Sequence, residues 1–405
     1  MQTQATHIRA THTRATRTQV AIIGAGPAGL LLAHLLHLDG ISSVVIEARS
    51  QSHVENRIRA GVLEHHVVDV LDQTGLGARM HREGLRHDGT GLLFGGALHR
   101  IDFQALTGHS VMVYGQHEVV RDLIAARQAA GEPLLFDCAD VSVHGFDTGS
   151  PEVGFTRDGQ AHTLQCDIIA GCDGFHGVCR PALPAGSWHG YDRVYPFGWL
   201  GILADAPPSA HELIYANHDH GFALCSQRSP AVQRMYLQCA PDEDAANWSD
   251  DRIWSELATR LACDGFTLQT GPITQKGVTP MRSYVAEPMQ CGRLFLAGDA
   301  AHIVPPTGAK GMNSAVGDVL LLARALGQWH GKGDDTGLQG YSAAALRRIW
   351  KVQRFSWWMT TLFHRFDGAS DFDRRMQLAE LDYVVGSRQA SAALAENYVG
   401  LPLAA

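Results

Sequence analysis

The sequence predicts an α/β protein that combines a parallel sheet near the N-terminus, an inserted and mostly antiparallel sheet, and a helical C-terminal region. An apolar run of strand length at 19–23 passes through a glycine-rich turn into an apolar helix. The stretch 188–279 is rich in β-branched and aromatic residues that alternate along short runs, which is typical of strands. Further on, 341–365 mixes apolar and basic residues at helical spacing.

Length and composition place the chain among ordinary globular proteins of two or three domains. It has 405 residues, of which 45% are hydrophobic and 18% are charged. A net charge of −8 gives no electrostatic reason to expect nucleic acid or an anionic membrane as a partner. The eight cysteines form no CxxC pair and follow no secretory signal, so we expect reduced thiols, a cytoplasmic location and no metal site.

The first strand, turn and helix form a nucleotide-binding pattern. Gly24 permits a tight turn, Gly26 lets the backbone approach a pyrophosphate, and Gly29 lets helix and strand pack closely. The free N–H groups and the positive dipole at the start of the helix would face the phosphates. A second apolar strand ends at Glu47, which suits hydrogen bonding to a ribose. This pattern predicts a dinucleotide without choosing between NAD and FAD.

Two later segments favour FAD. One apolar strand runs into Asp173, and another ends at Asp299 before a turn rich in Pro and Gly and a helix that starts near residue 311. The Asp299 carboxylate suits a sugar-alcohol chain, and the N–H groups of the following helix suit a flavin ring that becomes anionic on reduction. No second GxGxxG occurs in the sequence, so a reduced nicotinamide has no binding domain of its own.

The inserted sheet carries candidates for binding a carboxylate. We expect two strands within 213–228 around a turn at 218–221, and strand alternation places Ser226 and Arg228 on one face. The next strand should separate polar from apolar side chains: Arg234, Tyr236 and Gln238 on one side, Met235 and Leu237 on the other. A guanidinium beside hydroxyls suits bidentate capture of a carboxylate. The competing interpretation is a solvated strand face on which Arg228 pairs with a surface acid.

Together these motifs resemble the single-component FAD-dependent monooxygenases that hydroxylate phenols. Longer runs extend the resemblance from Gln19 to Pro402, including RIRAGVLE (57–64), GFALCSQRS (221–229), GDAAHIVPPTGAKG (298–311) and AENYVGLP (395–402). The resemblance implies a Rossmann-like FAD-binding fold and a homodimer. It also implies conversion of 4-hydroxybenzoate to 3,4-dihydroxybenzoate (protocatechuate) with O₂ and NADPH or NADH, through a flavin C4a-hydroperoxide.

The resemblance also assigns residues to the reacting centre. Tyr215 would hydrogen-bond the substrate phenol, Tyr398 would hydrogen-bond Tyr215, and His87 would link that pair to solvent. Without the resemblance, His87 would be interpreted as a solvent-facing histidine beside Asp88. The residues that would hold the substrate carboxylate are Ser226, Arg228 and Tyr236. Those expected beside the flavin are Pro306, through its carbonyl, Asn313 and Arg234.

Cofactor residues are carried over in the same way. The residues that would bind FAD are Gly24, Gly26, Ala28, Gly29, Glu47, Arg57, Arg59, Gln116, Asp173, Arg234, Asp299, Gly311, Met312 and Asn313. Those that would meet the nicotinamide co-substrate are Arg57, His176, Arg180 and Arg282. Where NADPH-specific members have an Arg directly after the acidic residue and a Tyr five further on, this chain has Ala48 and His53, with Glu55 nearby. Strict NADPH preference is therefore not expected, and NADH or dual use stays open.

Domain boundaries follow from the order of the motifs. We expect a disordered N-terminal extension at 1–18, with a transit peptide as the alternative. The expected FAD-binding domain comprises 19–86, 101–187 and 280–330, the substrate-binding sheet 87–100 and 188–279, and the helical and dimer region 331–405. His65 and His66, on an expected helix, are interpreted as surface residues.

Two other functions stay open at this stage. One is a related flavin enzyme, which would hydroxylate another phenolic acid, convert 3,4-dihydroxybenzoate to gallate, or halogenate a substrate. A WxWxIP-like element typical of halogenases is absent from the sequence. The other is a non-catalytic binding protein with an FAD fold, against which the complete set of expected catalytic side chains argues.

Overall fold

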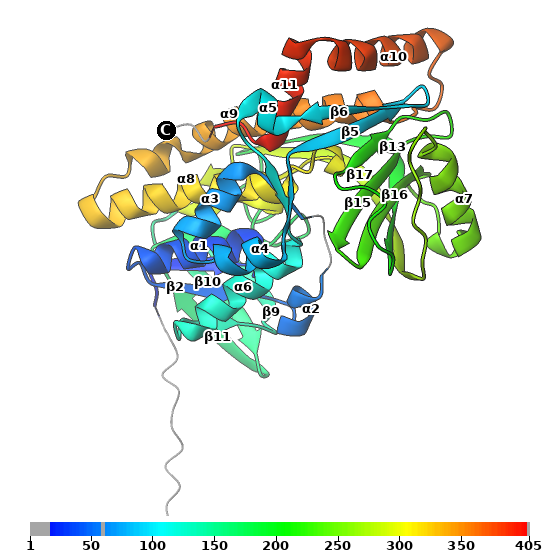
Figure 1. Cartoon of the computed structure of the whole chain (residues 1–405). Helices are drawn as coiled ribbons and strands as arrows, with labels where there is room; N and C mark the ends of the chain where they lie inside the picture. Colours follow the sequence, from blue (N-terminus) through cyan, green and yellow to red (C-terminus); the bar gives the residue numbers. More distant parts are fainter. Residues whose placement is uncertain (1–16, 58–60, 403–405) are drawn as a thin grey trace, which may run out of the picture.

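Two sheets of different kind dominate the computed structural model, which describes residues 17–57 and 61–402 (Figure 1). A six-stranded sheet lies in the lower part of Figure 1, and an eight-stranded sheet lies at the right. The last helices of the chain run along the top. The predicted combination of a parallel sheet, an inserted antiparallel sheet and C-terminal helices is confirmed.

The six-stranded sheet is the predicted parallel sheet. Its order is β18 (Gln290–Cys291), β19 (Leu294–Leu296), β12 (Ile168–Gly171), β1 (Val20–Ile23), β2 (Ser43–Ile46) and β8 (Leu134–Leu135). Every neighbouring pair is parallel except β18 and β19. The strands β1, β2 and β12 are buried at each residue, as expected where helices cover a parallel sheet.

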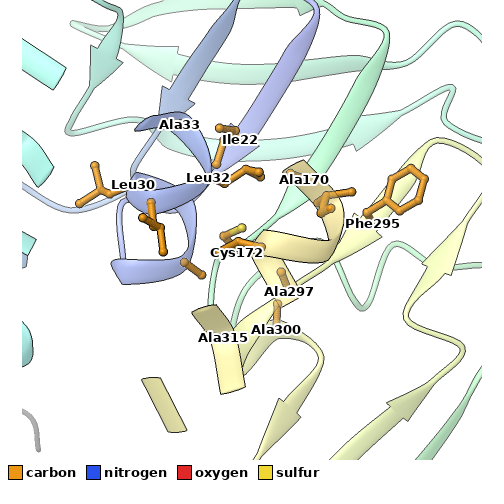
Figure 2. Close-up of a cluster of buried hydrophobic side chains, with 14 of the residues drawn as sticks. Ile22, Leu30, Leu32, Ala33, Ala170, Cys172, Phe295, Ala297, Ala300 and Ala315 are labelled. Carbon is orange, nitrogen blue, oxygen red and sulfur yellow. The ribbon is translucent and has the colours of Figure 1, made fainter. Parts of the chain in front are cut away.

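The helix after β1 is buried on nearly every side. This helix, α1 (Pro27–Leu38), packs against α6 (Gln116–Ala129) and α8 (Gly311–Lys332). Figure 2 shows part of the shared core, to which Ile22, Ala170 and Phe295 of the sheet, Leu32 of α1 and Ala315 of α8 all belong. Because α1 is apolar almost all round, it is stable only in such a position.

The eight-stranded sheet is mostly antiparallel. Its order is β20 (His302–Ile303), β17 (Ile273–Glu287), β13 (His189–Ala204), β16 (Val232–Cys239), β15 (Ala223–Ser229), β14 (Ile214–Ala216), β5 (Gly89–Phe94) and β6 (Ala97–Asp102). The β14–β5 pair is parallel and the others are antiparallel. The N–H of Gly221 donates to the carbonyl of His218 (2.9 Å) between β14 and β15, which confirms the predicted hairpin.

The two faces of this sheet pack against different helices. One face carries the fully buried Met235 and Leu237 and packs on α7 (Asp250–Arg260). The opposite face carries Tyr215 and Leu224 and shares a core with the C-terminal helices. These helices are α9 (Thr336–Phe363), α10 (Asp371–Gly386) and α11 (Arg388–Val399). The predicted alternation along β16 is therefore confirmed.

Smaller elements complete the described chain. One three-stranded sheet contains β11 (Gln160–Gln165), β10 (Glu152–Arg157) and β9 (Ala139–His144), and another contains β3 (Val62–Leu63), β7 (Val111–Val113) and β4 (Leu85–His87). The short α-helices are α2 (Gln51–Glu55), α3 (His65–Gln73), α4 (Gly77–Glu83) and α5 (Phe103–Thr107). Three 3₁₀ turns are η1 (Ala245–Asn247), η2 (Gly298–Ala300) and η3 (Pro306–Gly308).

The described chain begins inside the expected N-terminal extension. Residues 1–16 lie outside the described part. Arg17 already forms a bridge with Gln165, and the N–H of Thr18 donates to the carbonyl of Gln165 (3.0 Å). Within 17–57 and 61–402, no helix is both long and apolar enough to cross a membrane.

Candidate active site

The predicted cofactor residues converge at one edge of the parallel sheet. Gly24 follows β1, Glu47 follows β2, Asp173 comes shortly after β12, and Asp299 comes shortly after β19. These four strands are parallel neighbours. Their carboxyl ends therefore meet at the same edge, which is where ligands bind in such sheets.

The glycines of the first turn have different tasks. A side chain at Gly24 (φ +102°) would place its Cβ 2.4 Å from the carbonyl oxygen of Cys172, and one at Gly29 would place it 2.0 Å from that of Gly24. The fold itself requires these two glycines. A Cβ at Gly26 would meet nothing within 4 Å, so protein packing does not require this glycine, and the open approach to its backbone fits the pyrophosphate of FAD.

The two helices that begin at this edge leave their first N–H groups uncapped. The N-cap of α1 is Gly26 and that of α8 is Lys310; neither side chain accepts a hydrogen bond there, and neither first turn contains an acid. By contrast, Ser249 and Ser370 cap α7 and α10 with their side chains. Uncapped N–H groups at the positive end of a helix suit an anion. This donor set fits the phosphates and the ring of FAD.

Glu47 and Asp173 already accept backbone hydrogen bonds at this edge. Glu47 accepts the N–H of Ala25 on Oε2 (2.7 Å) and that of Arg49 on Oε1 (2.8 Å), which ties the end of β2 to the glycine turn. Asp173 accepts the N–H of Cys179 on Oδ2 (2.8 Å). Its buried Oδ1 has no hydrogen-bond partner among the described residues, and burial raises the pKa of this carboxyl. Both carboxylates lie where the resemblance expects the cofactor.

Asp299 is exposed in the turn between β19 and α8. A Cβ at the preceding Gly298 (φ +62°) would lie 3.1 Å from the Cβ of Ala315 and 3.4 Å from that of Ala28. The turn therefore touches the first turns of both α8 and α1. A carboxylate at this junction fits the ribityl chain that joins the pyrophosphate to the flavin ring.

The remaining FAD residues lie at helix starts or outside the described part. Gln116 is the first residue of α6 and is half-buried. Gly311 and Met312 begin α8, and a Cβ at Gly311 would meet nothing within 4 Å, as at Gly26. Arg59 lies outside the described residues. The open approach at Gly311 again fits a ligand rather than protein packing.

Arg180, expected to meet the nicotinamide, is buried in the structure. Its Nη1 donates to the carbonyl of Ala300 (2.9 Å) and its Nη2 donates to that of Phe175 (2.5 Å). The guanidinium carbon lies 4.4 Å from the ring centroid of Phe175 and 4.8 Å from that of Tyr284. Arg180 thereby joins the turn after β12 to the turn after β19, a connection that the sequence did not reveal.

The other three nicotinamide residues are closer to solvent. Arg57 and His176 are exposed. Arg282 is half-buried and binds Asp192 through Nε (2.7 Å) and Nη2, and its guanidinium carbon lies 4.7 Å from the ring centroid of Phe175. The structure therefore brings Arg180 and Arg282 around Phe175.

Strand register places the predicted substrate residues on one face of the eight-stranded sheet. Leu224 of β15 pairs with Tyr215 of β14 and with Tyr236 of β16. Two residues along β15, Ser226 pairs with Arg234. Because paired residues share a face and alternate residues return to it, these five side chains point to the same side of the sheet. This is the face that packs on the C-terminal helices.

One end of this face carries two guanidinium groups. The pKa of Arg228 is lowered, and burial is the largest cause. The phenol of Tyr236, which is hydrogen-bonded to Arg228, raises this pKa, and the nearby charge of Arg234 lowers it. The guanidinium carbon of Arg234 lies 5.1 Å from the ring centroid of Tyr236. Ser226, on the same face, is buried. A desolvated guanidinium at Arg228 and a second, half-buried one at Arg234 lie near hydroxyl groups and favour an anion, so this end fits a carboxylate.

The other end is neutral and closed to solvent. The hydroxyls of Tyr215 and Tyr398 lie 2.7 Å apart, and the two residues are 1% and 2% exposed. Burial raises the pKa of both phenols, so both stay protonated at neutral pH. His87 is also buried, which lowers its pKa to about 4. Neither ring nitrogen of His87 has a hydrogen-bond partner among the described residues, so the structure joins the two tyrosines but not His87.

Pro306 begins η3, just before α8, and Asn313 lies in the first turn of α8. The carbonyl of Pro306 accepts the N–H of Ala309 (2.9 Å). The side-chain amide of Asn313 donates to the carbonyls of Val62 (2.9 Å) and Ala309 (2.7 Å), and its Oδ1 accepts the N–H of Glu64 (3.0 Å). Asn313 thus holds the first turn of α8 against β3.

The interpretation of His65 and His66 as surface residues is wrong. His66 is 8% exposed and His65 is half-buried. The reason is tertiary, because the C-terminal segment returns over the start of α3, where His65 Nδ1 lies 2.8 Å from the carbonyl oxygen of Val399. The buried positions of α3 include Val67 and Val70, and this periodicity places His66 on the inner side of the helix.

Two buried pairs of polar side chains beside the site had no signature in the sequence. Lys310 donates to Oε1 of Glu64 (2.5 Å), and both side chains are 3% exposed. Asp318 of α8 accepts the N–H of Gly298 (2.9 Å) and lies 2.6 Å from Nε2 of His302. The first pair supports the start of α8, and the second fixes the turn that carries Asp299.

Comparisons with known proteins agree with this geometry. A family model described as "FAD binding domain" matches residues 17–356. The p-hydroxybenzoate hydroxylase of Acinetobacter baylyi is 50% identical over 388 residues, which cover 95% of this chain and 95% of that protein. A 3-(3-hydroxy-phenyl)propionate/3-hydroxycinnamic acid hydroxylase of Paraburkholderia xenovorans is 26% identical over 319 residues, covering 74% of this chain and 48% of that protein. The crystal structure of p-nitrophenol 4-monooxygenase PnpA from Pseudomonas putida DLL-E4 shares the fold, with a TM-score of 0.79 at 19% identity over 95% of this chain and 99% of that one.

Proposed function

The chain belongs to the family of FAD-dependent p-hydroxybenzoate hydroxylases, and from this membership we propose that it converts 4-hydroxybenzoate to 3,4-dihydroxybenzoate. The observation that carries the proposal is a single sheet face with guanidinium groups at one end and the buried Tyr215–Tyr398 pair at the other. These ends match the carboxylate and the phenol of one small aromatic acid. The balanced reaction consumes O₂, a reduced nicotinamide and a proton, and it releases water and the oxidised nicotinamide with the dihydroxy product.

FAD would lie along the edge of the parallel sheet. The start of α1 and Gly26 would hold the pyrophosphate, Asp299 the ribityl chain, and the start of α8 the flavin ring. When bound, FAD supplies the electrons that activate O₂ and delivers one electrophilic oxygen atom to the substrate. The protein contributes position, charge and exclusion of water.

The charged end would fix the orientation of the substrate. Arg228 would bind the carboxylate with Ser226 and Tyr236, and Tyr215 would hydrogen-bond the phenol at the opposite end. A substrate held at both ends has little freedom to rotate in the pocket. The ring carbon next to the hydroxyl then faces the flavin, which accounts for the 3,4-dihydroxy product.

The neutral end would remove the phenolic proton. A free phenol has a pKa near 10, so its ionisation at pH 7 costs roughly 4 kcal/mol. The two guanidinium groups stabilise the phenolate, and the proton leaves through the hydroxyls of Tyr215 and Tyr398 toward His87. Burial lowers the pKa of His87 to about 4, so at pH 7 its neutral ring would pass the proton on to solvent and would not keep it.

The reduced nicotinamide would be NADPH, NADH or both. The segment after β2 lacks the Arg and Tyr of NADPH-specific members, and Glu55 accepts a hydrogen bond from Gln51 there (2.7 Å). The exposed Arg57 and His176 would meet the co-substrate. Arg180 binds backbone carbonyls and Arg282 binds Asp192. These two arginines would support the residues that contact the co-substrate.

We also propose a homodimer in a reducing, cytoplasmic environment. The outer side of α10 exposes Phe372, Met376 and Tyr383 at 72%, 55% and 60%. An apolar stripe of this size on one helix is typical of a surface that another subunit covers. All eight cysteines are free thiols, as expected for a reducing compartment.

Product analysis tests the proposed function directly. The purified protein should be yellow, and 4-hydroxybenzoate under air should yield 3,4-dihydroxybenzoate with NADH, NADPH or both. Parallel reactions with other phenolic acids, including 3,4-dihydroxybenzoate itself, establish the substrate range. A yellow protein that forms no dihydroxybenzoate from 4-hydroxybenzoate with either nicotinamide would contradict the proposal.

A pair of glycine variants tests the proposed position of FAD. Gly26→Ala should fold normally, because its methyl group meets no protein atom within 4 Å. It should bind FAD more weakly, because the methyl group would occupy the space through which the pyrophosphate approaches the backbone. Gly29→Ala should destabilise the fold itself, because its methyl group meets the carbonyl of Gly24. Thermal unfolding and FAD content of both purified variants separate the two effects.

A further inference from the structure

The end of α11 is held by side chains from other elements. The last carbonyls of a helix have no partner within that helix and need donors from elsewhere. In α11, Lys310 donates to the carbonyls of Asn397 and Tyr398 (3.1 Å for the latter), and His65 lies within hydrogen-bond distance of the carbonyl of Val399 (2.8 Å). These are the last three residues of the helix. The backbone around Tyr398 is therefore fixed by two donors, Lys310 and His65, that come from other elements of the same chain.

His65 is well placed for this task. It is the first residue of α3, and its ring stacks on that of His109 with centroids 4.0 Å apart and planes 20° apart. The backbone at the start of α3 sets the direction of Nδ1, and the His109 ring packs against the face of the imidazole. A proton on Nδ1 is present in the imidazolium and in one neutral tautomer, so this nitrogen can donate to Val399 in both states.

The residue after α11 packs tightly on the neighbouring histidine. A Cβ at Gly400 (φ +115°) would lie 2.6 Å from Oε2 of Glu64 and 2.7 Å from Nδ1 of His66. The chain therefore has no free space on this side. Lys310 and His65 hold the carbonyls, while His66 and Glu64 support the turn that follows.

We infer that His65 is a positioning residue for hydroxylation: through the carbonyl of Val399 it holds the Tyr398 hydroxyl against that of Tyr215. The inference rests on the proposed function, because it concerns the path by which the substrate proton leaves. The hydroxyl pair is 2.7 Å apart inside the protein, and O–H···O bonds weaken quickly beyond about 3 Å. Even a small shift of α11 therefore interrupts the path, while the carboxylate end, on β15 and β16, stays in place.

Three variants separate the hydrogen bond from packing. His65→Phe keeps a ring that can stack on His109 but removes the donor. His65→Asn loses the ring but keeps an N–H donor close to the position of Nδ1. His109→Ala removes the stacked neighbour and leaves His65 intact. Each purified holoprotein is checked for FAD content and thermal unfolding before use.

Two measurements on each variant then test the inference. The first is coupling, the amount of dihydroxybenzoate formed per nicotinamide oxidised. The second is the pH at which bound 4-hydroxybenzoate ionises, followed by its absorbance on the oxidised holoprotein. In His65→Phe, we expect coupled hydroxylation to fall about tenfold, as for the loss of one hydrogen bond, and ionisation to move to higher pH. Its dissociation constant for 4-hydroxybenzoate should stay within about twofold of wild type, because Arg228 is untouched.

The pattern across the variants decides the outcome. His65→Asn and His109→Ala should behave like wild type in both measurements. Wild-type coupling and ionisation in His65→Phe would overturn the inference, and so would an equal loss in His65→Asn, because packing alone would then explain the effect. A wild-type protein that binds FAD and forms no dihydroxybenzoate would instead refute the proposed function, whatever the variants show.

Discussion

The two ends of the candidate substrate face are built in different ways. The charged end lies on two adjacent strands, β15 and β16, where Arg228 hydrogen-bonds Tyr236 and Arg234 lies over the Tyr236 ring. The neutral end joins Tyr215 of β14 to Tyr398, which is 183 positions away in the sequence. The first end attracts an anion by charge, and charge acts over several ångströms. The second depends on the distance between two uncharged hydroxyls. Binding and proton removal therefore place different demands on the fold.

The largest expected effect is at the neutral end. In Tyr215→Phe, we expect hydroxylation to fall by about 10²- to 10⁴-fold, the usual contribution of a proton-transfer group. FAD content should be unchanged, because Tyr215 lies on the other sheet. The measurement is the amount of dihydroxybenzoate, determined by chromatography, together with the amount of nicotinamide oxidised in the same reaction. Tyr236→Phe, at the charged end, is the matched control and should act mainly on substrate affinity. Coupled hydroxylation by Tyr215→Phe would remove the neutral end from the proposed mechanism.

Acid stability provides a second test of the neutral end. His87 has a pKa of about 4 in the folded protein against 6.5 for an ordinary histidine, because burial disfavours its charged form. Between these two values the unfolded chain binds a proton and the folded protein does not, so stability is present above pH 6.5 and is lost as the pH falls toward 4. A difference of this size corresponds to on the order of 3 kcal/mol.

The matched variant for this test is His87→Gln, which removes the titrating group. Urea unfolding at pH 7 and pH 4.5 gives the free energy of unfolding of both proteins. The decrease between the two pH values should be smaller in His87→Gln than in wild type by a few kcal/mol. An equal decrease in both proteins would show that His87 has the same pKa in the folded and unfolded states, and burial would then not disfavour its charged form.

The charged end should affect binding more than chemistry. In Arg228→Ala, the KM for 4-hydroxybenzoate should rise about 10- to 100-fold, since hydrogen bonds to a charged group contribute roughly 1.5 to 3 kcal/mol. Arg228→Lys should give an intermediate KM, because it keeps the charge and loses the planar fork. Steady-state kinetics of both variants measure KM and kcat separately. An unchanged KM in Arg228→Ala would place the carboxylate elsewhere.

The cofactor edge could be predicted from the sequence because its parts are local. Gly24, Gly26, Gly29 and Glu47 lie within one strand–turn–helix–strand unit, and the chemistry of each position follows from that unit alone. The alternation that puts Tyr236 on the substrate face is equally local. A short segment whose apolar pattern determines its structure also determines where its polar residues point.

The parts that could not be predicted depend on tertiary packing. Nothing near His66 in the sequence indicates that the C-terminal segment covers it, so the sequence predicts a surface residue where the structure has a buried one. The resemblance assigns Arg180 to the nicotinamide, and no pattern in the sequence indicates that its guanidinium packs between Phe175 and Tyr284. The pairing of Tyr215 with Tyr398 came from family resemblance, because no periodicity connects β14 to α11. Each of these contacts depends on how separate elements pack together. Periodicity describes only residues within one element, so it predicts none of them.

The smallest expected effect is at the hydroxyl of Ser226. This buried residue shares the sheet face with Arg234 and Tyr236, and among the described residues its Oγ makes only a long contact of 3.5 Å to the carbonyl of Gln227. Its hydroxyl is therefore able to donate to the substrate carboxylate. One such bond contributes about 1 kcal/mol, so Ser226→Ala should raise KM about fivefold and leave kcat close to wild type. Ser229→Ala, at the end of the same strand, is the matched control and should change neither constant.

The ratio between the two KM effects tests what drives binding at the charged end. If charge dominates, Arg228→Ala must cost several times more affinity than Ser226→Ala, and high salt should weaken wild-type binding only slightly, because a buried pair is poorly screened. Equal losses in the two variants would mean that the carboxylate is held by hydroxyl groups on the strand. The charged end would then differ from the neutral end in location alone, since both would work through hydrogen bonds between uncharged protein groups and the substrate.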